Sequence, residues 1–202
     1  MKHLKNIVFD FGGVLIDWNP VYLYKNVFDN EEKMNDFLEN ICTSEWNLQQ
    51  DKGRSLNEAT RILKEKHPEF ADEIEMYYGR WTEMLGGMIE ENVKLIKPLK
   101  QKYKVYGLTN WSSETIPHAM DRYDFFKDLD GMVVSGAEKL VKPDYKIYQI
   151  LLDRYNIKAE ESLFIDDNAA NIKAAEEMNF KVVHLTDGLN LIEWLKDKGI
   201  MP

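Results

Sequence analysis

The sequence predicts an α/β fold: a doubly wound parallel sheet with a small helical segment inserted after its first strand. Five short apolar runs have the length and the bounding residues of buried strands. The later runs alternate with helical patterns, which is typical of a parallel sheet covered by helices. Between the first two runs lies a long stretch with only helical spacing. A chain of 202 residues, 44% of them hydrophobic, is large enough to form such a core.

The first expected strand spans residues 7–9 and ends at Asp10, where Gly12 and Gly13 break the apolar run. The other four strands are expected at 105–108, 131–134, 163–165 and 182–185. Helical repeats follow the third and fourth of the five strands, and they are formed by Ile147, Ile150, Leu151 and Tyr155, and by Ile172, Ala175 and Met178. Helices between consecutive strands favour a parallel arrangement.

The stretch from 20 to 91 shows no convincing strand. Its helical stripes are formed by Met34, Phe37, Leu38 and Ile41, then by Ala59, Ile62 and Leu63 behind a capping box at 55–58, and then by Ile74, Tyr77, Tyr78, Trp81 and Leu85, which Gly86 and Gly87 end. We therefore expect a core domain formed by 1–17 and 92–202, and a helical cap domain at 18–91 that covers a cleft. Pro98 should kink or shorten the helix that follows.

Charge and composition exclude several classes of protein. The net charge of −9, with acidic and basic residues mixed along the chain, argues against binding to a nucleic-acid backbone. No stretch approaches the ~20 apolar residues of a membrane span, and there is no secretory signal pattern. The single cysteine, Cys42, permits no internal disulfide. We expect a cytoplasmic protein, and the sequence leaves its oligomeric state open.

Polar residues stand where the expected strands end. Asp10 follows the first strand, Thr109 and Asn110 the second, and Asp166 with Asp167 the fourth, while Lys142 lies shortly beyond the third. Ligands of open parallel sheets bind outside the carboxyl ends of the strands. An Asp after a strand is usually a turn or cap residue, so each position alone is weak evidence. The set in this order predicts a functional site.

These motifs resemble the signature of the haloacid dehalogenase-like (HAD) hydrolase superfamily, over residues 7 to about 185. They read Phe9-Asp10-Phe11-Gly12-Gly13-Val14-Leu15, Leu108-Thr109-Asn110, Val141-Lys142-Pro143-Asp144 and Phe164-Ile165-Asp166-Asp167-Asn168. The surroundings of Lys142 and Asp166 look like the branch with bacterial sugar-1-phosphate phosphatases and the N-terminal phosphatase domain of soluble epoxide hydrolase. The resemblance implies a Rossmann-like HAD core with a helical cap.

The resemblance also implies a Mg²⁺-dependent phosphatase acting on a small phosphorylated metabolite, with a sugar 1-phosphate as one candidate. Asp10 would be the nucleophile that forms an aspartyl-phosphate. The Mg²⁺ ligands would be the carboxylates of Asp10 and Asp166 and the carbonyl of Gly12, with Asp167 acting through water or a hydrogen bond. Oxygen ligands of this kind suit Mg²⁺.

The remaining expected roles concern the phosphoryl group and the substrate. Lys142 would offset the negative charge on Asp10 and on the phosphoryl oxygens. The Thr109 hydroxyl and the backbone N–H of Asn110 would hold the phosphate. Trp111, directly after the second motif, is a candidate for the wall of the substrate pocket. Most simply, the tryptophans are core or cap-interface residues.

One position departs from the family pattern. Superfamily phosphatases usually carry a second Asp two residues after the nucleophile as general acid and base, and here that residue is Gly12. We therefore expect a preference for esters with good leaving groups, such as sugar 1-phosphates, acyl phosphates and aryl phosphates. Asp17 is a candidate replacement for the acid, although a carboxylate in a loop or cap hinge is the simpler interpretation of it.

Three alternatives stay open at this point. A metal-independent 2-haloacid dehalogenase would share the fold and the nucleophile, but dehalogenases lack the paired Asp that Asp166 and Asp167 form here. A catalytically weak regulatory or scaffold homologue is supported by Gly12 alone. A phosphomutase generally relies on the acid that is missing at this position.

Overall fold

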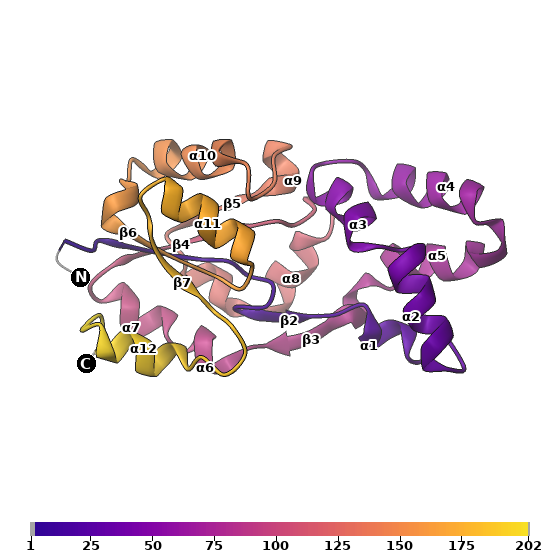
Figure 1. Cartoon of the computed structure of the whole chain (residues 1–202), viewed down its shortest axis with the longest axis horizontal. Coiled ribbons are helices and arrows are strands. Elements are labelled where there is room, and N and C mark those ends of the chain that lie inside the picture. Colours follow the sequence, from indigo (N-terminus) through magenta and orange to yellow (C-terminus); the bar gives the residue numbers. More distant parts are fainter. Residues whose placement is uncertain (1–2, 202) are drawn as a thin grey trace.

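The computed structural model describes residues 3–201 and has a five-stranded parallel sheet as its centre (Figure 1). The strand order is β5-β4-β1-β6-β7, and the bounds are Asn6–Phe9 for β1, Lys104–Thr109 for β4, Gly131–Val134 for β5, Ser162–Asp166 for β6 and Lys181–His184 for β7. All five strands expected from the sequence are present, and the doubly wound α/β prediction is confirmed.

The register of the sheet brings the motif residues to one edge. β1 lies in the middle, with Phe9 opposite Gly107 of β4 and opposite Ile165 of β6. Asp10 follows β1 directly, while Thr109 and Asp166 are the last residues of β4 and β6. Because the three strands are parallel, these residues meet at their common carboxyl end.

Side chains alternate between the two faces of the sheet, and both faces are buried. Val8, Leu108 and Phe164 belong to the apolar cluster packed on α10 (Tyr145–Tyr155) and α11 (Ala169–Glu177). Ile7 and Ile165 belong to the other cluster. That second face is covered by α7 (Ile96–Lys100), α8 (Ile116–Arg122) and α12 (Leu191–Asp197). Helices on both faces explain why the strands are continuous apolar runs.

Short elements connect these layers: α6 (Glu90–Val93), η3 (Asp124–Asp128), α9 (Ser135–Glu138) and η4 (Ala159–Glu161). As expected from Pro98, the helix that contains it is short, because α7 has only five residues. Within the described part of the chain, no helix combines the length and apolar character needed to cross a membrane.

The helices of the inserted segment (residues 18–91) lie together in a lobe beside the sheet (Figure 1). Its helices are α1 (Val21–Tyr24), α2 (Glu31–Asn40), α3 (Ser44–Asp51), α4 (Leu56–Lys66), η1 (Pro68–Phe70), α5 (Ala71–Gly79) and η2 (Trp81–Met84). The Ser55 side chain accepts a hydrogen bond from the backbone N–H of Glu58 at 3.3 Å, so the expected cap of α4 is present. Tyr24 packs on Phe37 and Tyr77 at the centre of this lobe.

One expectation about this segment is wrong, because it contains a strand. β3 (Leu85–Met88) pairs antiparallel with β2 (Ile16–Trp18), where the sequence predicted only a helix end at Gly86 and Gly87. Gly86 is needed for packing, and Gly87 for its backbone conformation, rather than for ending a helix. A Cβ atom on Gly86 would overlap the Asp17 carboxylate and the Tyr22 ring, and Gly87 adopts φ +136°.

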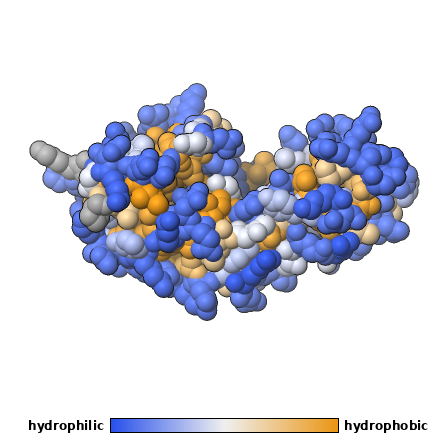
Figure 2. Space-filling view, turned by 90° about the horizontal axis from the view of Figure 1, so that it is seen from below, coloured by the Kyte–Doolittle hydropathy of each residue, from blue (hydrophilic) through white to orange (hydrophobic). Residues whose placement is uncertain are grey.

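The helical lobe also contacts the core lobe away from the β2–β3 ribbon. The Ser135 hydroxyl in α9 donates a hydrogen bond to the Asp51 carbonyl at the end of α3. The backbone N–H of Leu56 donates to Glu114 at 3.0 Å. Figure 2 shows the two lobes from below, with the surface narrowing between them. The inserted segment is therefore held to the core at two separate places.

Candidate active site

Lys142 joins the two buried carboxylates of the motif set. Its Nζ lies 2.9 Å from Asp10 Oδ2 and 2.6 Å from Asp166 Oδ2. The Lys142 side chain is 1% exposed, and those of Asp10 and Asp166 are 12% and 0% exposed. A buried lysine shared between two carboxylates has its charge compensated, which satisfies the requirement for pairing inside a protein. The expected convergence of these three residues is therefore present.

Burial and the charge of the ion-pair partner have opposite effects on the pKa values of Asp10 and Lys142. Burial raises the pKa of Asp10 to about 7, with Asp166 adding to the rise and Lys142 opposing it. Burial alone would lower the pKa of Lys142, but Asp10 and Asp166 outweigh it and raise that pKa. A cation bound next to Asp10 would favour its ionised form, which is the form a nucleophile needs.

Three carboxylates can share one cation. Oxygen atoms of Asp10, Asp166 and Asp167 all lie within 4.8 Å of one another. Asp167 stands at the exposed margin of this group, and its pKa is raised by burial and by Asp166. Gly13 leaves room for it, because a Cβ atom there would overlap the Asp167 carboxylate. Hard oxygen donors in this arrangement fit Mg²⁺.

Two asparagines hold Asp166 in place, and the sequence motifs had given neither of them a role. The Asn171 side-chain amide donates to both Asp166 oxygens at 3.1 Å, and the backbone N–H of Asn168 donates to Oδ1 at 2.8 Å. Asn171 is the third residue of α11, so its spacing from Asp166 was the available signal. These bonds fix the plane of the Asp166 carboxylate.

Asn110 contacts Lys142 through its side chain, whereas only its backbone N–H had been given a role. Asn110 Oδ1 accepts from the Lys142 N–H at 2.8 Å, and Nδ2 donates to the Lys142 carbonyl at 3.0 Å. The loop that carries Lys142 is thereby tied to the end of β4. Thr109 is 1% exposed at that end, beside the same group of residues.

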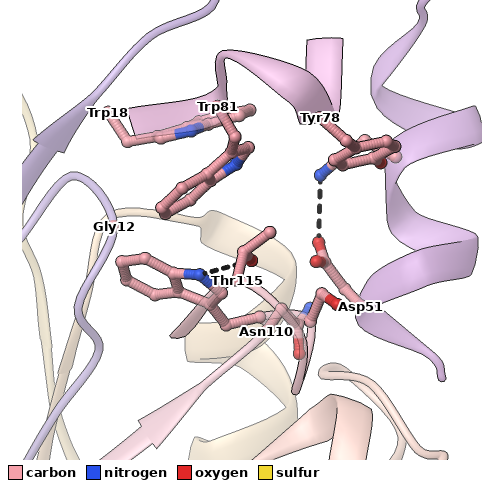
Figure 3. A pocket seen from close by; sticks show the side chains of 10 residues that line it. Gly12, Trp18, Asp51, Tyr78, Trp81, Asn110 and Thr115 are labelled. Atoms are coloured by element: carbon pink, nitrogen blue, oxygen red, sulfur yellow. Dashed lines mark hydrogen bonds between the residues drawn. The ribbon is translucent and has the colours of Figure 1, made fainter. Parts of the chain in front are cut away.

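A cleft opens between the helical lobe and the carboxyl ends of the strands, with about 430 Å³ of empty space including open solvent. We call it the cleft (Figure 3). The core residues that line it are Gly12, Asn110, Trp111, Ser112 and Thr115, and the residues from the ribbon and the helical lobe are Trp18, Asn47, Asp51, Tyr78 and Trp81. Gly12 and Trp111 thus both border the cleft, while Asp17 does not line it.

Aromatic rings form one wall of the cleft. Trp111 lies 5.7 Å from Trp81 between ring centroids, and its Nε1–H donates to Thr115 at 3.0 Å. The hydrogen bond and the ring contact hold Trp111 in a fixed orientation. Asp51 is the carboxylate among the cleft-lining residues, and no motif in the sequence pointed to it.

The fold is a doubly wound α/β sheet, and the site joins the aspartate after its central strand to a buried lysine. A family model described as haloacid dehalogenase-like hydrolase matches residues 7–185. The chain therefore belongs to the HAD-like hydrolases, as the sequence motifs implied.

Phosphatases match nearly the whole chain. The sesquiterpene phosphatase astK of Aspergillus oryzae is 28% identical over 92% of this chain and 91% of its own. A phosphorylated carbohydrates phosphatase of Thermotoga maritima is 25% identical over 94% of this chain and 91% of its own. In contrast, the (S)-2-haloacid dehalogenase 4A of Burkholderia cepacia, 29% identical, matches 41% of this chain and 36% of its own.

The fold recurs in a solved structure with the expected metal. A HAD family enzyme of Bacteroides thetaiotaomicron, determined as a magnesium complex, superimposes with a TM-score of 0.78 over 96% of this chain and all of that chain. The identity is 22%, so this likeness concerns the fold. Magnesium, the cofactor expected from the sequence, is thus found in a neighbour of the same architecture.

Proposed function

We propose that this hydrolase is a Mg²⁺-dependent phosphatase that acts on a small phosphorylated metabolite through an aspartyl-phosphate on Asp10. The observation that carries the proposal is the contact of the Lys142 ammonium with Asp10 and Asp166 beside the carboxylate of Asp167. Phosphoryl transfer needs a compact group of positive and negative charges of this kind, because both nucleophile and substrate are anionic.

Each of these residues has its own role in phosphoryl transfer. An Asp10 oxygen attacks phosphorus, and the ester oxygen leaves with the alcohol. Lys142 offsets the charge of Asp10 and of the phosphoryl oxygens. The Thr109 hydroxyl and the Asn110 N–H hold the phosphoryl group, and Asn110 also fixes the backbone of Lys142. Water then attacks the phosphoryl group and releases Asp10.

The metal site uses Asp10, Asp166, Asp167 and the carbonyl of Gly12. Their hard oxygen donors, with three carboxylates inside 4.8 Å, fit a divalent cation that takes oxygen ligands. Bound Mg²⁺ would neutralise charge on the nucleophile and the phosphoryl oxygens. Asn171 holds Asp166 in the orientation that this role requires.

We further propose that residues 18–91 form the cap domain of a core made of 1–17 and 92–202, and that the cap selects the substrate. The cleft between them supports this division, because both parts supply its lining. Aromatic faces from Trp18, Trp81 and Trp111 suit the apolar faces of a carbohydrate or another small organic group. A sugar 1-phosphate is therefore a candidate substrate.

The alternatives make different demands on the site. A 2-haloacid dehalogenase needs no cation, yet three carboxylates stand together here. A scaffold homologue needs neither a paired lysine nor a cleft, and both are present. The phosphomutase alternative has no observation in its favour.

The test is a screen of phosphorylated small molecules with Mg²⁺ and with EDTA, using Asp10→Asn as the matched control. We expect turnover that requires Mg²⁺ and Asp10. Full activity on a 2-haloacid in EDTA would establish the dehalogenase instead. Absence of turnover on any phosphate ester or haloacid would favour the scaffold interpretation.

A further inference from the structure

Superfamily phosphatases usually carry a general acid at the position of Gly12, and in this chain the space that its side chain would fill is open. A Cβ atom on Gly12 would have no neighbour within 4 Å, and Gly12 borders the cleft. In an in-line displacement the leaving oxygen lies on the side of phosphorus opposite the attacking Asp10 oxygen. That side faces away from the sheet edge, toward the cap. Any group that protonates the leaving oxygen must therefore reach into the cleft.

The cap places one carboxylate there. Asp51 ends α3 and lines the cleft together with Gly12 and Asn110. Asp17, the replacement considered from the sequence, lies in β2, where the Tyr22 hydroxyl donates to it at 2.7 Å, and it does not line the cleft. Of these two acidic residues, only Asp51 meets the spatial requirement.

A chain of hydrogen bonds orients the Asp51 carboxyl group. Gln50 Nε2 donates to the Tyr78 hydroxyl at 2.8 Å, and that hydroxyl donates to Asn47 Oδ1 at 2.9 Å. Asn47 Nδ2 then donates to Asp51 Oδ2 at 3.2 Å (Figure 3). The Ser112 N–H of the core also donates to this carboxylate. Asp51 is thus held by both lobes, in the place where cap and core meet.

We propose that Asp51 is the general acid and base of this enzyme and replaces the Asp that is missing at Gly12. The inference rests on the proposed phosphatase function. It also changes the expectation drawn from Gly12 alone, because a cap carboxyl that supplies the proton brings unactivated alkyl esters within the range of substrates.

The reaction balances with Asp51 in this role. An Asp10 oxygen bonds to phosphorus while the bond from phosphorus to the ester oxygen breaks, and the Asp51 proton passes to that oxygen to release an alcohol. Asp51, now a carboxylate, takes a proton from the attacking water. The water oxygen bonds to phosphorus while the bond from phosphorus to Asp10 breaks. Inorganic phosphate leaves, and Asp51 is again an acid.

The surroundings of Asp51 suit an acid that works near neutral pH. Burial raises the pKa of Asp51 to about 7, against the opposing effect of the Ser112 N–H. At neutral pH a carboxyl group with such a pKa is partly protonated, so it can donate a proton to the leaving oxygen. Its ionised form is basic enough to accept a proton from water. The aromatic wall of the cleft provides the apolar environment.

The experiment compares Asp51→Asn with the unaltered protein on para-nitrophenyl phosphate, phenyl phosphate and ethyl phosphate, with Mg²⁺. A nitrophenolate leaves without a proton, whereas ethoxide needs one. Loss of the base should slow hydrolysis of the shared aspartyl-phosphate for all three esters, so the readout is kcat/KM, which reports the transfer to Asp10. We expect kcat/KM for ethyl phosphate to fall ~10²–10⁴-fold in the variant, with kcat/KM for para-nitrophenyl phosphate unchanged. Asp17→Asn is the matched control and should leave both values unchanged. Adding Gly12→Asp to Asp51→Asn should restore turnover of ethyl phosphate.

Each other outcome has a definite meaning. An equal loss of kcat/KM on both esters assigns Asp51 a structural role and overturns the proposal. No loss of kcat/KM on either ester overturns it as well. If the unaltered protein hydrolyses none of the esters, both the phosphatase proposal and the proposed role of Asp51 are wrong. If it hydrolyses them and Asp51→Asn has no effect, only the proposed role of Asp51 is wrong. If Asp51→Asn does not fold, Asp51→Ser serves for the same comparison, because it keeps an acceptor for the Ser112 N–H.

Discussion

The side chain of Asn110 forms two hydrogen bonds with the backbone of Lys142, accepting from its N–H at 2.8 Å and donating to its carbonyl at 3.0 Å. A single amide thus satisfies both backbone groups of the residue whose ammonium joins Asp10 to Asp166. The end of β4 and the loop beyond β5 are held together at this point. The position of the Lys142 ammonium therefore depends on a residue that contacts neither carboxylate through its own side chain.

Replacing Asn110 by alanine should slow the enzyme without unfolding it. Each lost bond contributes about 1 kcal/mol, and a displacement of ~1 Å in the Lys142 ammonium can cost ~10²-fold in rate. We expect kcat to fall about 10–100-fold with a small change in Tm. Asn190→Ala, which removes the N-cap of α12 away from the site, is the control for Tm. Unchanged kcat would show that Lys142 is positioned without Asn110.

Replacing Asp10 by asparagine should remove turnover and keep the fold. An amide has nearly the same shape but is hardly nucleophilic, so kcat should fall ~10⁴-fold or more, as for other covalent nucleophiles. Intact-protein mass spectrometry after rapid acid quench should find a phosphoryl adduct on the unaltered protein and none on the variant. Asp187→Asn, at an exposed position, is the control. Near-native turnover by a pure Asp10→Asn preparation would contradict the mechanism.

Replacing Gly13 by alanine should weaken the response to Mg²⁺. The new Cβ would displace the Asp167 carboxylate, and the half-saturating Mg²⁺ concentration should rise about 10-fold or more, as when other partners of metal sites are lost. Gly188→Ala is a matched control, because Gly188 has φ +84° and Gly13 has φ +70°, and a Cβ on Gly188 has no neighbour within 4 Å. Equal Mg²⁺ curves for the two variants would mean that Asp167 is not needed.

The pKa of Asp51 predicts a pH-dependent difference in stability. Its folded-state pKa of about 7 lies above the ordinary value near 3.9, so the folded protein binds more protons between about pH 4 and pH 7 and loses stability as the pH rises through this window. Asp51→Asn lacks this loss. The Tm of Asp51→Asn minus the Tm of the unaltered protein should therefore increase from pH 5 to pH 8. Each kcal/mol of difference in stability corresponds to ~2–4 °C in Tm. Measurements in EDTA keep metal binding out of the comparison, and a difference independent of pH would contradict the raised pKa.

The sequence predicts the sheet and the motif residues because both depend on local patterns. Each strand is a continuous apolar run, since helices cover both faces, and Asp10, Thr109 and Asp166 follow from where the strands end. Parallel order then brings these ends together without knowledge of the side chains. The positions of Lys142 and Asp167 followed from the family motifs.

Other features depend on contacts between distant segments, and no local pattern reveals them. The three-residue strand β2 is too short to show alternation, and its partner contains Gly86 and Gly87, which suggested a helix end. Asp51 is an unremarkable acidic residue at the end of a short helix until the cap is folded onto the core. The bonds from Asn110 to Lys142 join residues 32 positions apart.

The β2–β3 ribbon has a consequence for how this protein can diversify. Its strands pair Trp18 with Leu85, so the two ends of the intervening helical stretch lie side by side on the core. Replacing that stretch by another helical module, or by a tight turn, leaves the spacing of the ends unchanged and does not disturb the central sheet. Substrate range can therefore change while Asp10, Lys142 and Asp166 stay in register, because residues 19–84 are exchangeable as one piece. Asp51 lies within that piece, so an exchange would also remove the proton donor proposed here.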